Sequence, residues 1–209
     1  MGVDEETVFI DALDGVEIEA AVVRTEAARP RATVIVAHPH PLHGGDRHNH
    51  VVRAFQRAAH EMDAHSIAVN FRGVGMSGGT HDDGDAERLD LAAACELAEM
   101  MEPEADIILA GYSFGAVVAL NVTHPSVLGW IAMAPPLSMM PSNPTSSRHH
   151  RHKWLWMCEH DQFTAVTDAE RRAAEWTNAT VHRIDGVDHF IAVGAYDTAL
   201  AALRTALSA

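Results

Sequence analysis

The stretch Ile107–Val122, IILAGYSFGAVVALNV, decides the fold, because Gly111-Tyr112-Ser113-Phe114-Gly115 joins an apolar run of strand length to a run that is apolar almost all round. A strand that turns directly into a helix needs glycines around the turn, because Cβ atoms would not fit there. The turn raises the hydroxyl of Ser113 above the strand end and leaves the N–H of Phe114 at a helix N-terminus, where negative charge is favoured. The pattern therefore predicts a nucleophilic serine at 113 and an oxyanion donor at 114.

A second stretch, Gly75-Met76-Ser77-Gly78-Gly79, has the same G-x-S-x-G pattern, and with Gly73 its glycines also match a dinucleotide-binding fingerprint. Both motifs require a helix to begin immediately. Residues 79–84 instead read Gly-Thr-His-Asp-Asp-Gly, which is typical of a loop. We therefore expect no nicotinamide site and no nucleophile at Ser77. The alternative at Ser113 is an ordinary glycine-bounded turn, which both flanks of the turn disfavour.

On both sides of the Ser113 turn, apolar runs of strand length alternate with amphipathic runs of helical length. The expected strands are Thr7–Asp11 and Val16–Arg24 as a hairpin, then Thr33–Ala37, Ile67–Phe71, Ile107–Ala110, Trp130–Ala134, Leu155–Cys158 and Thr180–Ile184. Helices are expected near residues 51–62, 89–100, 116–122, 167–176 and 191–207, and Thr167 with Glu170 has the form of a capping box. This order predicts an α/β fold with a mostly parallel sheet of about eight strands and helices on both faces. We expect one domain over residues 1–209, since neither a repeat nor a linker interrupts the chain.

The composition of the 209-residue chain restricts its partners and its compartment. With 15 Lys plus Arg against 29 Asp plus Glu, the formal charge is −14, which disfavours nucleic acid or an anionic membrane as a partner. The two cysteines, Cys95 and Cys158, form no disulfide framework. The acidic start does not resemble a secretory signal, and the longest apolar stretch is too short and too interrupted to span a bilayer. We therefore expect a cytoplasmic protein.

A nucleophilic serine needs a base, and the base needs an acid that orients it. Asp161 follows the predicted strand that ends at residue 158, and His189 lies between the last predicted strand and the last helix. The chain order Ser113, Asp161, His189 resembles the order of nucleophile, acid and base in α/β hydrolases. Glu159 is the main alternative to Asp161 because it lies closer to the strand end. Asp188 adjoins His189, so we expect it to close the loop rather than orient the ring.

A second oxyanion donor is expected from the loop after Thr33–Ala37, which reads His38-Pro39-His40-Pro41-Leu42-His43-Gly44-Gly45. Pro39 and Pro41 have no N–H, so the first donor inside the loop is the backbone N–H of His40. The prolines restrict this peptide before substrate arrives, and one such donor contributes about 3 kcal/mol in the transition state. The alternative is that the prolines only stiffen the exit from the strand.

Together these features resemble the α/β-hydrolase superfamily, and within it the small lid-less hydrolases with an H-P-H-P segment after the third strand. The matching residues are His38–Pro41 with Gly44, Gly45 and Asn49, Asn70–Gly75 with Ser77, Gly111–Gly115, Asp161 and His189-Phe190, so that the similarity extends from about Thr7 to the C-terminus. The resemblance implies the fold and a triad of Ser113, Asp161 and His189. It does not define the substrate, since the superfamily contains esterases, thioesterases, amidases, peptidases, lactonases and non-hydrolytic members.

The remaining polar clusters indicate neither a metal nor a cofactor. Histidines cluster in residues 38–43, 48–50 and 149–152, but their spacing matches no standard metal motif. Between the strands expected to end at 134 and begin at 155, about twenty residues are available, too few for a lid domain. The basic run Arg148–Lys153 in this segment either recruits a carboxylate-bearing substrate or is simply solvated, and solvation is the more common role of such a run.

The sequence therefore predicts a serine hydrolase that cleaves small carboxylic esters or thioesters through an acyl-enzyme, with a small acyl compound as its partner. A peptidase, amidase or acyltransferase on the same triad is one alternative. A non-catalytic binding protein of the same fold is the other. The sequence defines neither the acyl chain length and leaving group nor the oligomeric state.

Overall fold

The core of the structure is an eight-stranded sheet with the strand order β1-β2-β4-β3-β5-β6-β7-β8. The computed structural model describes residues 4–208. The strands are β1 (Glu6–Asp11), β2 (Glu17–Val23), β3 (Thr33–Ala37), β4 (His65–Val69), β5 (Ile107–Tyr112), β6 (Val127–Met133), β7 (His152–His160) and β8 (Ala179–Asp188). β2 pairs antiparallel with β1 and β4, and the other neighbours pair in parallel. The predicted α/β fold is confirmed.

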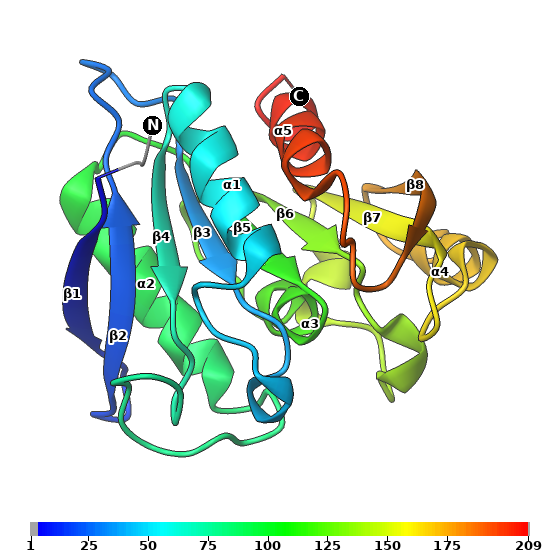
Figure 1. Cartoon of the computed structure of the whole chain (residues 1–209), viewed down its shortest axis with the longest axis horizontal. Helices are drawn as coiled ribbons and strands as arrows, with labels where there is room; N and C mark the ends of the chain where they lie inside the picture. The colour runs from blue at the N-terminus through cyan, green and yellow to red at the C-terminus, as the bar shows by residue number, and fades with distance from the viewer. Residues whose placement is uncertain (1–3, 209) are drawn as a thin grey trace.

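Helices cover both faces of this sheet, as predicted (Figure 1). They are α1 (His50–Glu61), α2 (Glu87–Met101), α3 (Phe114–Leu120), α4 (Val166–Ala173) and α5 (Ala195–Ala206), with short 3-10 helices η1 (Pro41–His43), η2 (Leu137–Met139) and η3 (Thr145–Arg148). α1 and α5 share one buried apolar cluster with the sheet, and α2, α3 and α4 share the other. Because β3 and β5 are covered on both faces, their sequences are continuous apolar runs. None of the helices between residues 4 and 208 has the length and apolarity that a membrane span needs.

The predicted strands differ from the observed ones mainly at their ends. β3 has the predicted bounds. β4 (His65–Val69) begins and ends two residues earlier than the predicted Ile67–Phe71. The chain leaves the sheet after Val69 because the next N–H groups bond elsewhere: Asn70 donates to the carbonyl of Glu19, and Phe71 donates to the ring of His38. These bonds tie the segment after β4 to β2 and to the end of β3.

One predicted helix start and one predicted helix cap are wrong. α5 begins at Ala195 and not near residue 191, because Ile191 and Gly194 adopt left-handed backbone conformations, with φ of 47° and 77°. α4 begins at Val166 after an N-cap at Ala165 that makes no side-chain hydrogen bond, so the predicted capping box at Thr167 is not formed. Thr167 instead lies inside the first helical turn, one residue after the start of α4, and so cannot be the N-cap.

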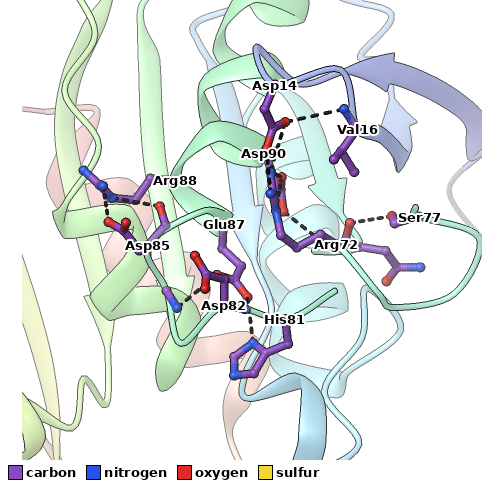
Figure 2. A network of polar contacts seen from close by, with 12 residues as sticks. Asp14, Val16, Arg72, Ser77, His81, Asp82, Asp85, Glu87, Arg88 and Asp90 are labelled. Atoms are coloured by element: carbon purple, nitrogen blue, oxygen red, sulfur yellow. Dashed lines mark hydrogen bonds and ion pairs between the residues drawn. The ribbon is translucent and has the colours of Figure 1, made fainter. Parts of the chain in front are cut away.

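The loop between β4 and α2 is fixed by buried ion pairs. Arg72 lies 2.7 Å from Asp90 of α2 and 2.8 Å from Asp14 of the β1–β2 turn (Figure 2). Its two partners raise the pKa of the Arg72 guanidinium further above its usual value, so the group stays charged although it is buried. The hydroxyl of Ser77 accepts from the N–H of Glu19 in β2 and donates to the carbonyl of Asn70 after β4. The Ser77 hydroxyl therefore ties this loop to β2, and its proton is already donated to a backbone carbonyl.

Candidate active site

Ser113 lies on a sharp turn between β5 and α3. Its backbone has φ 54° and ψ −119°, a strained conformation for a residue with a side chain. A Cβ at Gly111 would lie 2.3 Å from the carbonyl oxygen of Gly115, and a Cβ at Gly115 would lie 2.4 Å from the carbonyl oxygen of His38. Only glycine fits at both positions, which is the physical reason for the predicted pattern.

The structure brings the three predicted side chains into one hydrogen-bonded row. Ser113 Oγ lies 2.8 Å from His189 Nε2, and His189 Nδ1 lies 2.8 Å from Asp161 Oδ2. Asp161 and His189 are almost completely buried, with side-chain exposures of 1% and 5%. A carboxylate can only accept, so Nδ1 carries a proton and the lone pair of Nε2 faces the serine hydroxyl. The other carboxylate oxygen of Asp161 accepts from the N–H groups of Phe163 and Thr164.

The two other acidic residues near these strand ends have different contacts. Glu159 accepts from the N–H of Gly186 at 2.8 Å and lies 3.7 Å from Arg183. Asp188 accepts from the N–H of Phe190 at 3.0 Å, which closes the loop as expected. Neither carboxylate bonds to the His189 ring, so the geometry favours Asp161 over the alternative Glu159.

Residues that sequence reasoning missed hold the backbone around His189. Tyr112 donates its hydroxyl to the carbonyl of His189 at 2.7 Å, and Gln162 accepts from the N–H of His189 at 3.2 Å. His50 Nε2 lies 3.1 Å from the carbonyl oxygens of both Phe190 and Ile191. Tyr112 belongs to the Ser113 turn and Gln162 adjoins Asp161, so their positions were visible in the sequence, but nothing there indicated these bonds.

The two predicted oxyanion donors come from loops that meet beside Ser113. The rings of His40 and Phe114 are in contact, with centroids 5.0 Å apart. Among residues 4–208, no acceptor engages the backbone N–H of either residue. The loop is tightly wound, because a Cβ at Gly45 would lie 2.0 Å from the carbonyl oxygen of Pro39. Both N–H groups are therefore available to a ligand at Ser113.

His38 joins the ends of β3 and β4 directly before this loop. Its Nδ1 lies 2.6 Å from the carbonyl oxygen of Pro39, and its Nε2 accepts from the N–H of Phe71 at 3.0 Å. The side chain is fully buried, and burial lowers the pKa of His38 from 6.5 to about 4. A neutral imidazole therefore fixes the start of the loop that carries His40.

Acid should destabilise the protein through His38. The unfolded chain binds a proton here near pH 6.5 and the folded chain only near pH 4, so the stability is complete above pH 6.5 and falls as the pH drops toward 4. The shift corresponds to about 3 kcal/mol of unfolding free energy. We expect urea unfolding at about pH 7 and about pH 4.5 to show most of this loss, and His38→Asn to lose correspondingly less. Equal losses in the two proteins would contradict this role, whatever the stability of the variant at neutral pH.

Two cavities meet at Ser113. The smaller has a volume of about 190 Å³, and its lining includes Asn49, His50, Tyr112 and His189. The larger has a volume of about 350 Å³ and is mainly apolar, with walls formed by His40, His43, Asp83, Ser113, Phe114, Val117, Pro136, Met139, Met140 and Phe163. Met139 and Met140 come from the segment between β6 and β7, which carries η2 and η3 but no lid helices.

The cysteines and the candidate metal ligands lie outside this site. Burial raises the pKa of Cys158 to about 12, so its thiol is a poor nucleophile at neutral pH. Within residues 4–208, one group of ligand-type side chains is close enough to hold a metal ion, namely Glu96, Glu99 and His124. It lies near the end of α2 and the start of β6, at the amino edge of the parallel strands and away from Ser113.

The basic run Arg148–Lys153 also lies at the amino edge, because β7 begins at His152. Lys153 is fully buried and donates to the carbonyls of His149 and Arg151 at 2.6 and 2.7 Å. This run therefore lies at the opposite edge of the sheet from Ser113 and lines neither of the cavities there.

The mostly parallel sheet and the strained serine turn at its carboxyl edge define the α/β serine hydrolase class. The family model described as serine aminopeptidase, S33, matches residues 28–204, and the chain belongs to this family of α/β hydrolases. The protein is thus an enzyme of the α/β-hydrolase type, as its sequence predicted.

Three relatives are similar to this chain over 79% or more of its length. An α/β serine hydrolase homologue from Coxiella burnetii is 26% identical, with a TM-score of 0.87 and 98% of each chain covered. XC6422 from Xanthomonas campestris, a serine hydrolase without a lid, is 27% identical, with a TM-score of 0.79 and 100% and 94% of the two chains covered. The uncharacterized protein RP471 of Rickettsia prowazekii is 26% identical over 186 residues, which are 79% of this chain and 74% of that protein. The predicted resemblance to lid-less hydrolases is confirmed.

Proposed function

We propose that the protein hydrolyses small carboxylic esters, or thioesters, through an acyl-enzyme on Ser113. The observation that carries this proposal is the row of hydrogen bonds from Ser113 through His189 to Asp161. In this row Asp161 fixes the tautomer of His189 and stabilises the imidazolium, and His189 acts as the base for the serine hydroxyl.

The reaction has two halves. Ser113 Oγ forms a bond to the substrate carbonyl carbon, its proton passes to His189 Nε2, and the carbonyl π electrons move onto the oxygen, which the N–H groups of His40 and Phe114 hold. When this oxyanion collapses, the bond to the leaving group breaks, and His189 gives its proton to the departing oxygen or sulfur. Water then attacks the acyl-enzyme and gives a proton to His189. The carboxylic acid leaves, and the proton returns to Ser113.

The two cavities bind different parts of the substrate, one the acyl group and the other the leaving group. His189 must protonate the leaving group, and it lines the smaller cavity but not the larger one. We therefore place the leaving group in the smaller cavity and the acyl group in the larger one. The flexible side chains of Met139 and Met140 suit apolar acyl chains of differing shape.

Val117→Phe should shorten the acyl chain that the enzyme accepts, because Val117 lies in the wall of the larger cavity. Against a panel of nitrophenyl esters, we expect the kcat/KM for long acyl chains to fall at least about tenfold, with the acetyl ester little affected. Val193→Phe is the matched control, because Val193 is exposed and lines neither cavity. Uniform losses over all chain lengths would show that the acyl group does not bind beside Val117.

A choice of substrates tests the proposed reaction directly. We expect rapid hydrolysis of nitrophenyl butyrate and slow or no hydrolysis of aminoacyl nitroanilides, whose amide bond a peptidase would prefer. Added alcohols or amines should compete poorly with water for the acyl group, whereas an acyltransferase would form the new ester or amide. Faster cleavage of the anilides, preferred transfer to an acceptor, or no reaction with either substrate would each overturn the ester-hydrolase proposal.

A further inference from the structure

Glu87, at the start of α2, is a fully buried carboxylate that the proposed reaction does not use. One oxygen accepts from the N–H of Asp82 at 2.9 Å and lies 2.6 Å from Nδ1 of His81. The other accepts from the N–H of Gly84 at 2.9 Å. Figure 2 shows this carboxylate turned toward His81 and the loop at Asp82. Within residues 4–208, its only ion-pair partner is the imidazole of His81. Glu87 is thus bonded entirely to the loop 81–84.

This loop packs against both residues that supply the proposed oxyanion donors. The ring of His81 lies 4.9 Å from the ring of His40 and 5.3 Å from the ring of Phe114, measured between centroids. Gly84 also contacts the ring of Phe114, since a Cβ at Gly84 would lie 3.5 Å from that ring. His81 therefore contacts both the loop after β3, through His40, and the Ser113 turn, through Phe114.

We propose that Glu87 and His81 are positioning residues that set the distance between the two oxyanion donors. The N–H groups of His40 and Phe114 belong to different loops, and no hydrogen bond between residues 4–208 engages either of them. The backbones of these loops meet where Gly115 approaches the carbonyl oxygen of His38, and their side chains meet at the ring of His81, which Glu87 holds. A displacement of about 1 Å between catalytic groups is enough to lower a rate about a hundredfold. This inference rests on the proposed function, because it needs an oxyanion at Ser113.

Glu87→Gln tests the inference with almost no change in size. Every partner of the carboxylate is an N–H donor, so the new amide group must point one of its own N–H groups at a donor. The loop or the His81 ring then has to move. We expect kcat for nitrophenyl butyrate to fall about 10- to 100-fold with little change in KM, because the oxyanion forms only in the transition state. The inhibition constant of an alkyl trifluoromethyl ketone, whose serine adduct carries the same oxyanion, should rise by a similar factor.

Asp90→Asn is the matched control, since Asp90 is equally buried on the same helix and also accepts only from donors, all on Arg72. Asp90→Asn should lower the Tm but leave kcat and the inhibition constant unchanged well below the Tm. If Glu87→Gln behaves in the same way, the residue is only structural and the inference is wrong. Should Glu87→Gln fail to fold, His81→Phe keeps an aromatic ring beside Phe114 but cannot bond to Glu87, and the same losses are expected. Full activity of Ser113→Ala would instead overturn the proposed function itself.

Discussion

Ser113→Ala should lower kcat for nitrophenyl esters by a factor on the order of 10⁶, because members of a catalytic triad act as a unit and the loss of one removes the covalent route. The fold should persist. The hydroxyl of Ser113 bonds only to His189 among the described side chains, and the turn is held by backbone bonds from residues 113, 116 and 117. The residual rate then reports what the oxyanion donors and the cavities contribute without a nucleophile.

A fluorophosphonate probe provides an independent measurement, since it forms a covalent adduct with an activated serine and releases fluoride. We expect mass spectrometry to locate the adduct on residue 113, and the adduct to be absent from Ser113→Ala. Ser77→Ala is a natural control because Ser77 lies in the second G-x-S-x-G stretch. It should keep its label and its activity and lose stability, as the Ser77 hydroxyl bonds to two backbone groups in the fold. Undiminished labelling and activity of Ser113→Ala would exclude Ser113 as the nucleophile.

The position of Ser113 was predictable from a short local pattern, and those of Asp161 and His189 from the order of the strands. The serine turn needs two glycines at fixed positions, as the close approaches of Gly111 and Gly115 show. The proposed acid and base, Asp161 and His189, follow the parallel strands β7 and β8, whose carboxyl ends lie at one edge of the sheet. Strand order therefore places residues far apart in the sequence beside one another.

The contacts that hold this row in place were not predictable, because each joins segments with no shared pattern. His50 on α1 bonds to the carbonyls after His189, and Glu87 on α2 holds the ring that packs on the oxyanion loops. A buried carboxylate such as Glu87 reads in the sequence as a solvated charge at a helix start, which is where acidic residues normally occur. The misplaced start of α5 has a similar cause, since the left-handed backbone at Ile191 is unusual for a β-branched residue.

Asp161→Asn should lower kcat by a factor on the order of 10⁴ while leaving the geometry of the site nearly intact. The reason lies in the second oxygen of this carboxylate, which accepts from the N–H groups of Phe163 and Thr164. In the variant these two donors keep the amide oxygen in that position, so the amide NH₂ must face Nδ1 of His189. Nδ1 then has to accept, the ring proton moves to Nε2, and the imidazole presents a donor to the serine instead of a lone pair. The base is lost although every side chain remains in place.

Glu159→Gln is the control for this prediction, because Glu159 lies near the end of the same strand and was the alternative acid. Its carboxylate accepts a hydrogen bond from the N–H of Gly186, and the amide oxygen of glutamine can accept the same bond. The kcat of this variant should therefore stay within about twofold of the wild type. Comparing the kcat of both variants on nitrophenyl butyrate, alongside their Tm, separates the two carboxylates. A large loss in Glu159→Gln together with a small one in Asp161→Asn would assign the acid to Glu159. The tautomer argument would then fail, since nothing in the row from Ser113 to Asp161 would depend on a carboxylate at 161.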